Sequence, residues 1–170
     1  INRRITMGIP SSVTRFGKNE PFDLQVSRNQ IYDHKVIFKF GFNPDINGSE
    51  ETIWDAGGIY AYPSAATVMK VSSSSTDDTA AGTGARTILV QGLDGDYNEA
   101  EEIVTLNGQT AVNTTTSFLR VNRAYVLTAG SGGTAAGNIY VGVGTVTIGV
   151  PATIYAQITL GENQTLMGLW

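Results

Sequence analysis

The sequence predicts an all-β protein, a β-sandwich or jelly-roll-like single domain that carries an extended N-terminal arm. Three observations predict this fold class. Short runs rich in Val, Ile, Thr and Tyr follow one another at close spacing and are separated by turn-forming residues. No stretch keeps helical spacing for more than a turn or two. Only 15% of the residues are charged, and Thr and Ser can face water on a strand without charge.

The chain divides by charge into a predicted arm, residues 1–40, and a predicted body, residues 41–170. The arm holds seven basic and three acidic residues, a formal balance of +4, whereas the body holds four basic and twelve acidic residues, a balance of −8. Contact with an acidic protein surface is favoured over a solvated tail. Nucleic acid is disfavoured because the bases are dispersed and not interleaved with aromatics. The predicted partner-binding residues are Arg3, Arg4, Arg15, Lys18 and Arg28.

In the first part of the chain, strands are predicted at 35–42, 68–72, 87–92 and 101–106. The first of these ends in the turn-forming segment 43–49. The runs 87–92 and 101–106 flank a polar stretch and are predicted to form a hairpin. Asn107-Gly108 predicts a tight turn, because both residues accept a positive φ at low cost.

In the second part, residues 117–127 are predicted to form one strand. The runs 138–143 and 145–148 are predicted to pair, as are 154–160 and 165–170. A weak internal echo precedes two of the strands: Thr-Ala-Ala-Gly occurs at 79–82 and again at 134–137. Two copies are too few for a solenoid, so the echo is interpreted as a loop type used twice to lead into a strand.

The residue types that carry most enzyme chemistry are scarce. The chain has no cysteine, which excludes a thiol nucleophile and a Cys-based zinc or iron–sulfur site. His34 is the single histidine, and no Gly-x-Ser-x-Gly nucleophile elbow occurs. We therefore expect His34 to be structural, and we predict no catalytic residue, no cofactor and no metal site.

Oxygen ligands at alternate positions make residues 94–99 resemble the start of an EF-hand loop. The match fails at position six, which is Glu99, and at position twelve, which is Thr105. The segment is instead predicted to be a polar hairpin turn in which Asp94 and Asn98 accept from backbone donors, and a calcium site of another kind stays open. Glu101 and Glu102 are neighbours on a strand, so they point to opposite faces and form no catalytic dyad.

Two further polar segments are interpreted as loops. Residues 82–87 are glycine-rich but lack the Lys and Ser/Thr of a phosphate-binding loop. Residues 72–78 are Ser- and Asp-rich. No apolar run approaches the ~20 residues of a membrane span, so no membrane partner is expected. Nor is there a secretory signal, and the Asn-x-Ser/Thr sites at Asn47, Asn113 and Asn163 are expected by chance in a Thr-rich chain.

Several long stretches are similar to a family of virion structural proteins of tailed phages, especially those of marine and cyanobacterial hosts: 52–58, 77–87, 92–94, 97–99, 104–108, 118–120, 130–133 and 161–167. The resemblance covers roughly residues 50–170. It implies a head decoration, knob or fibre component that is located in the virion and assembled in the host cytoplasm. It also implies other virion proteins as partners, first the major capsid protein, and a homo-oligomer such as a trimer.

The chain departs from that family in two ways. The relatives continue past the equivalent of Trp170, and this chain begins at Ile1 without an initiator Met. A processed or partial product is therefore expected, and its last pair of strands would then need a partner. The family offers no catalytic motif to carry over.

Three functions follow as expectations of decreasing weight. The first is a non-enzymatic capsid decoration or knob-like protein attached to the head through the N-terminal arm. The alternative is a tail-fibre or adhesin module that binds host glycans by aromatic stacking on Trp54, Tyr60, Tyr62 or Tyr97. The third is a glycosidase on a jelly-roll scaffold, for which no spacing fixes the separation of the available carboxylates: Asp55, Asp94, Asp96, Glu99 and Glu102.

Overall fold

The computed structural model describes residues 21–28, 30–32, 34, 39–41, 48–49, 54, 56–57, 59–166 and 168–169. Its contacts group the chain into two compact units, residues 1–38 with Trp170 and residues 39–169. Each unit is described by itself. Of the predicted strand 35–42, the described strand is β1, Lys39–Phe40. The predicted turn 43–49 lies outside the described residues except for Gly48 and Ser49.

The first unit contains a short helix, α1, at Phe22–Ser27. The Pro21 carbonyl accepts hydrogen bonds from the amides of Leu24 and Gln25, at 3.1 and 3.2 Å, and this turn begins the helix. The helix buries Val26. It lies in the segment predicted to be extended, so that prediction is wrong at these residues. Within the part of the chain that the structure describes, no helix has the length and apolar character needed to cross a membrane.

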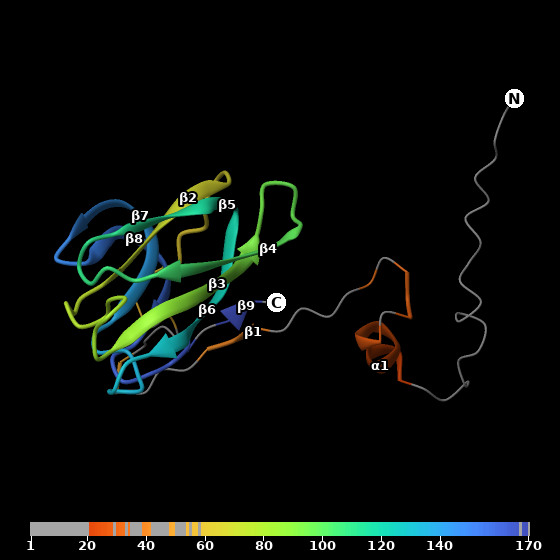
Figure 1. The fold of residues 1–170 in the computed structure, drawn as a ribbon. Helices are drawn as coiled ribbons and strands as arrows, with labels where there is room; N and C mark the ends of the chain where they lie inside the picture. The colour runs from red at the N-terminus through yellow and green to blue at the C-terminus, as the bar shows by residue number, and fades with distance from the viewer. Residues whose placement is uncertain are drawn as a thin grey trace, which may run out of the picture. The chain divides into compact units, whose positions relative to one another are not determined.

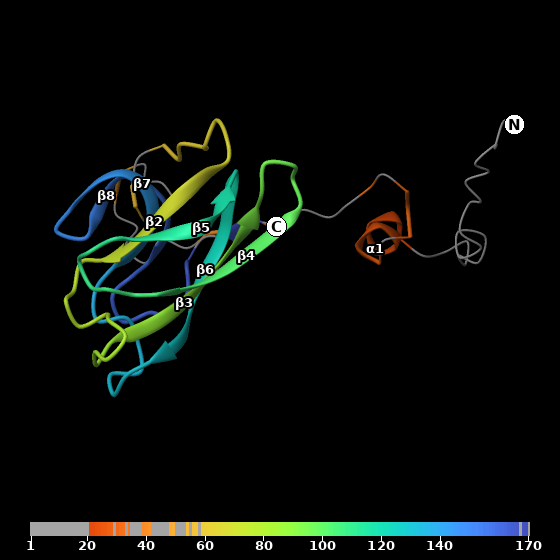
Figure 2. The same cartoon turned by 45° about the horizontal axis from the view of Figure 1, so that its top comes forward.

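The second unit is a sandwich of two antiparallel sheets, which confirms the predicted fold class (Figures 1 and 2). One sheet has the order β5-β2-β7-β8 and the other β4-β3-β6, while β1 and β9 form a separate two-residue pair. The strand bounds are β2 Thr67–Ser73, β3 Ala85–Leu93, β4 Glu99–Thr105, β5 Val112–Phe118, β6 Arg120–Ala129, β7 Ile139–Thr147, β8 Val150–Ile158 and β9 Gly168–Leu169.

The core lies between the two sheets. Val71 of β2 and Val141 of β7 belong to the same buried cluster as Ile88 and Val90 of β3. Successive side chains of a strand point to opposite faces. In the run Ile88-Leu89-Val90, the first and third side chains therefore point into the core and Leu89 points away from it. Burial of each such side chain stabilises the fold by about 1.5–3 kcal/mol. Phe118 is the largest of the fully buried side chains.

The predicted strand 68–72 and the predicted hairpin of 87–92 with 101–106 are confirmed as β2 and the β3–β4 pair. Leu89 lies opposite Ile103, and the pairing runs without a break from Thr87 to Leu93. Gly108 has a φ of 60°, and Thr110 N donates to Asn107 O at 3.1 Å, so Asn107-Gly108 is the predicted turn. It joins β4 of one sheet to β5 of the other.

Residues 117–127 do not form the single strand that their composition predicted. The chain leaves one sheet at Phe118, the end of β5, and enters the other at Arg120, the start of β6. Phe118 and Leu119 are both buried, which two neighbours on a regular one-sided strand cannot be. The Leu119 amide donates to Leu93 O at 2.7 Å and ties this corner to β3.

The two pairings predicted near the C-terminus are also wrong. Residues 138–148 do not fold back at Gly144, whose φ of 87° permits an irregularity inside one continuous strand, β7. The turn comes later, at Ile148 and Gly149, which both have positive φ. Residues 154–158 therefore end β8 and pair with β7. Residues 163–165 lie along β6, where Val126 N donates to Asn163 O at 2.8 Å.

Candidate functional site

Three loops meet at Asp78, which is completely buried. The carboxylate accepts four hydrogen bonds: from Ser73 Oγ at 2.5 Å, Ala85 N at 2.7 Å, Ala136 N at 2.9 Å and Gly137 N at 3.0 Å. Its backbone carbonyl accepts a further one from Gly108 N at 2.8 Å. A buried carboxylate requires such compensation, so Asp78 fixes the loop before β3, the loop before β7 and the loop between β4 and β5.

Two glycines allow these loops to approach so closely. A Cβ on Gly84 would meet Asp78 Oδ1 and would lie 2.6 Å from Ala136 Cβ. A Cβ on Gly137 would lie 2.6 Å from Ser75 N. Real Cβ atoms do not approach that closely, so both positions require glycine for space and not for an unusual φ.

The Thr-Ala-Ala-Gly echo has a structural basis. The first copy, 79–82, follows Asp78 and leads into β3, while the second, 134–137, leads into β7 and donates two of its amides to the same carboxylate. This confirms the interpretation of the echo as a loop leading into a strand, and likewise the interpretation of 82–87. The segment 72–78 is not simply a polar loop, because Ser72, Ser73 and Asp78 are fully buried.

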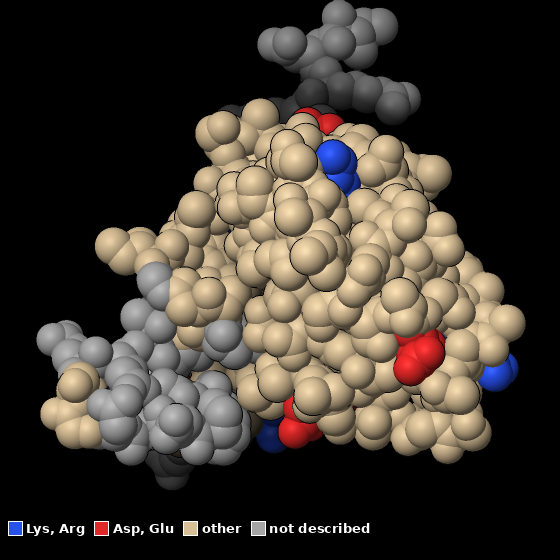
Figure 3. Space-filling model, turned by 90° about the vertical axis from the view of Figure 1, so that its left-hand side faces the viewer, with Lys and Arg blue, Asp and Glu red and all other residues tan. Residues whose placement is uncertain are grey.

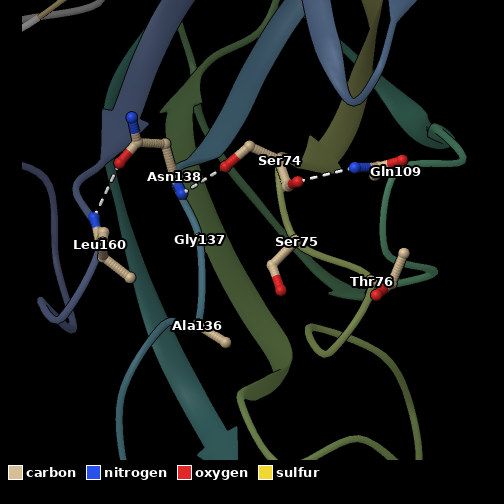
Figure 4. Close-up of a pocket in the computed structure, with 8 residues that line it drawn as sticks. All are labelled: Ser74, Ser75, Thr76, Gln109, Ala136, Gly137, Asn138 and Leu160. Atoms are coloured by element: carbon tan, nitrogen blue, oxygen red, sulfur yellow. Dashed lines mark hydrogen bonds between the residues drawn. The ribbon is translucent and has the colours of Figure 1, made fainter.

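A hollow of about 410 Å³ opens beside Asp78. Figure 4 shows Asn138 and Gln109 on either side of Ser74, with Ser75 and Thr76 below them. Ser74 Oγ accepts from Asn138 N at 2.9 Å, and Ser74 O accepts from Gln109 Nε2 at 2.8 Å. Leu160 N donates to Asn138 Oδ1 at 2.8 Å at the far side. The lining is polar and uncharged: Ser74, Ser75, Thr76, Gln109, Ala136, Gly137, Asn138 and Leu160.

The β3–β4 hairpin carries the carboxylates tested as calcium ligands. Asp94 Oδ1 accepts from the amides of Asp96 and Asn98, at 2.8 and 2.9 Å, which confirms the polar turn and the predicted role of Asp94. The Asn98 side chain does not accept as predicted, because its Nδ2 donates to Asp94 Oδ2 at 3.3 Å. The hydrogen bond from the Asn98 amide is the largest cause that lowers the pKa of Asp94 below its ordinary value. Across the described residues, no three of the His, Asp and Glu side chains gather into a group that could hold a metal ion.

Glu102 connects the edges of the two sheets. Its carboxylate on β4 accepts from the backbone amides of Thr115, at 2.9 Å, and Thr116, at 2.7 Å, which belong to β5. Partial burial would raise its pKa, but these amide donors outweigh it and lower the pKa below its ordinary value. Glu101 instead accepts from Gln91 Nε2 at 3.3 Å, so the two neighbours point to opposite faces as predicted.

The aromatic residues proposed for glycan stacking are mostly engaged with one another. Trp54 is buried, and its ring lies edge-on to Tyr60, with 5.1 Å between ring centroids. Tyr60 donates to Tyr155 O at 3.1 Å, and burial raises its pKa far above the ordinary value. Tyr62 contacts Tyr60, and the Arg120 guanidinium lies over the Tyr62 ring, 5.2 Å from the ring centroid. Tyr97, at the hairpin tip, is 66% exposed.

The remaining predicted residues belong to the N-terminal segment. Four of the predicted partner-binding residues lie outside the described residues: Arg3, Arg4, Arg15 and Lys18. Asp55 of the body also lies outside them. Arg28 is exposed at the end of α1. His34 is exposed, with Nδ1 2.9 Å from Tyr32 O and its ring edge-on to Phe22.

No family model, curated protein sequence or solved structure matches this chain. The class that the fold defines is an antiparallel β-sandwich. Sequence reasoning missed Asp78 and the hollow, whose residues come from four separate segments. The Thr-Ala-Ala-Gly echo was the one signal that pointed there.

Proposed function

We propose that this protein is a non-enzymatic structural component of a tailed-phage virion, a capsid decoration or knob-like subunit held on the head by its basic segment 1–40. The resemblance of residues 50–170 to virion proteins supports this proposal. So does the charge division, because a +4 segment on a −8 body suits attachment to an acidic shell or to a neighbouring copy. The subunit is proposed to act in the virion, next to the major capsid protein, as a homo-oligomer such as a trimer.

The observation that carries the proposal is the outer face of the three-stranded sheet. Ile103, Leu89 and Tyr125 lie side by side in one row across β4, β3 and β6. Ile103 is 62% exposed, whereas Leu89, in the middle of the row, is 8% exposed. The next row consists of Glu101, Gln91 and Arg123. An apolar row with a polar border is typical of surfaces that pack against another protein.

A second surface is short of charge. Figure 3 shows the end of the sandwich on the left of Figure 1, where charged side chains are few and widely separated. Ile148 is exposed at the β7–β8 turn with a φ of 49°, which a β-branched residue rarely adopts. Such a surface can approach a neighbour without desolvating many charges.

Two of the five carboxylates named for the enzymatic alternative are engaged in structural hydrogen bonds. Asp94 accepts backbone donors within its own turn, and Glu102 accepts backbone donors of β5. These contacts favour a structural role for both residues.

The first test is occupancy of the virion. A phage whose gene carries Gln in place of Arg3, Arg4, Arg15, Lys18 and Arg28 should yield particles with about tenfold less of this protein or lower, because each surface charge contributes about 0.2–1 kcal/mol. The control replaces Glu20 with Gln and Asp23 with Asn in the same segment. Quantitative mass spectrometry of purified particles gives the copy number. Normal occupancy of the first variant, or absence of the natural protein from virions, would contradict the proposal.

The second test concerns self-association. Ile103→Glu should lower the mass of the assembly measured by light scattering, because it places a charge in the apolar row. Thr105→Glu is the control, two residues further along the same strand face. An unchanged assembly mass for Ile103→Glu would show that this face is not the contact.

A further inference from the structure

The polar hollow beside Asp78 is a shallow depression, largely open to solvent, whose volume is that of a small molecule. Its volume of about 410 Å³ lies at the lower end of the range of about 300–1,000 Å³ found for ligand sites. Hydrogen bonds to a buried side chain hold part of its lining in place. Ala136 and Gly137, which line it, both donate to the buried carboxylate of Asp78, at 2.9 and 3.0 Å. Rigid walls lower the ordering cost of binding.

Several hydrogen-bonding groups of the hollow are left without a protein partner. Within the continuous stretch 59–166, Asn138 uses its Oδ1 and leaves its side-chain amide N–H groups unused, while Gln109 uses its Nε2 and leaves its Oε1 unused. The Thr76 hydroxyl has no partner in that stretch. Ser75 Oγ accepts from Asp77 N at 3.1 Å and still has its proton to donate. The lining thus offers both donors and acceptors to a ligand.

The chemistry of the lining selects against charged and purely apolar ligands. None of its eight residues carries a charged side chain, so an ionic ligand would lose hydration without gaining a counter-charge. A solute whose groups both donate and accept can satisfy amide and hydroxyl groups together. Leu160, 61% exposed at one side, offers an apolar patch for the C–H groups of such a solute.

We propose that this hollow is a binding site for a neutral saccharide. Sugar hydroxyls bind the Asn138 amide, Gln109 Oε1 and the hydroxyls of Ser75 and Thr76, and one sugar face packs on Leu160. The site is separate from the aromatic residues that the sequence suggested for glycans. It does not depend on the proposed virion role, because it uses the body alone and neither the N-terminal segment nor the outer sheet face.

The test is a titration of the full ¹⁵N-labelled chain with glucose, galactose, mannose and N-acetylglucosamine, followed by amide chemical shifts. At least one of these sugars should shift the signals of residues 74–76, 109 and 136–138 with a dissociation constant of about 1–10 mM. Inorganic phosphate, the charged probe, should leave those signals in place. Shifts with phosphate at similar concentration would overturn the assignment to a neutral ligand, as would the absence of shifts with all four sugars.

Variants at Thr76 locate the site, because this side chain is exposed and holds no other part of the fold. Thr76→Val removes one hydroxyl at constant shape and should raise the dissociation constant about twofold to tenfold. Thr76→Trp should block the hollow and abolish the shifts. The matched controls are Thr105→Val and Thr105→Trp on β4, which should bind like the natural chain. Retained binding by Thr76→Trp would overturn the proposal, and the spectrum of each variant shows directly that it is folded.

Discussion

Asp78 and Asp94 both hold the backbone in place by accepting hydrogen bonds, but they lie in very different surroundings. The side-chain oxygens of each aspartate accept hydrogen bonds from backbone amides. Asp78 is completely buried and receives donors from three separate segments, whereas Asp94 is only partly covered and its partners are within four residues. Water can replace the partners of Asp94 but not those of Asp78. The comparison separates a contact that organises the fold from one that shapes a turn.

The largest effect is expected for Asp78→Ala. It would leave four donors without an acceptor, three of them buried and one partly buried, so the free energy of unfolding should fall by about 3–5 kcal/mol. Urea unfolding followed by circular dichroism measures this. A loss of about 1 kcal/mol or less would mean that water or another group replaces the carboxylate, and the distinction between the two aspartates would fail.

A steric test reaches the same contact without changing the carboxylate. Gly84→Ala directs a methyl group at Asp78 Oδ1 and Ala136 Cβ and should cost about 2–3 kcal/mol. Gly95→Ala, in the Asp94 turn, is the matched change, because its Cβ would lie 3.3 Å from Ala66 Cβ, a tight contact that a shift of a few tenths of an ångström would relieve. It should change the free energy of unfolding by about 0.5 kcal/mol. Equal losses for both would show that the loops at Asp78 can move apart.

Substitution of Glu102 is expected to have an effect between those of Asp78 and Asp94, because Glu102 is partly buried and its carboxylate is bound to the neighbouring strand β5. Glu102→Gln should cost about 0.5–1 kcal/mol at neutral pH, a figure reduced for solvent screening. The pKa of Glu102 is lowered from its ordinary value of 4.5 in the folded chain. Its carboxylate therefore stabilises the fold above that value, and the contribution is lost as pH falls through the lowered pKa.

The measurement is the difference in unfolding free energy between the natural chain and Glu102→Gln at several pH values. The difference should be largest at pH near 7 and should shrink as the pH falls below 4.5. A difference that grows on acidification would contradict the assigned direction of the pKa.

The smallest effect is expected for Asp94→Asn. An asparagine side chain can still accept from the amides of residues 96 and 98, and the turn is open to water. The melting temperature should fall by less than for Glu102→Gln. A drop comparable with that of Asp78→Ala would show that exposure does not decide the importance of these contacts.

The contacts of Asp94 are local in the sequence and most of those that organise Asp78 are not, which explains which of them sequence analysis could predict. The Asp94 turn was predictable because its donors and acceptor lie within four residues. The β3–β4 hairpin was predictable because its two strands are neighbours in the chain. Two partners of Asp78, the amides of Ala136 and Gly137, are 58 and 59 residues away, and no local pattern encodes such a distance.

The errors in strand assignment have related physical causes. Residues 117–127 have strand composition throughout, and only tertiary packing places Phe118 and Leu119 in a corner between two sheets. At Gly144 the sequence suggests a turn, whereas the β7–β8 pairing absorbs the positive φ as an irregularity. The hollow was not predictable because it combines segments 74–76, 109, 136–138 and 160.

The strand order also sets how this chain must reach its native state. β2 is hydrogen-bonded between β5 and β7, so neither of its partners is the next strand along the chain. During synthesis β2 leaves the ribosome well before residues 139–147, and until they follow, one edge of β2 is unpaired. Folds dominated by such distant pairings reach the native state in milliseconds to seconds. The rate at which folded chains accumulate is then governed by completion of the C-terminal half of the chain.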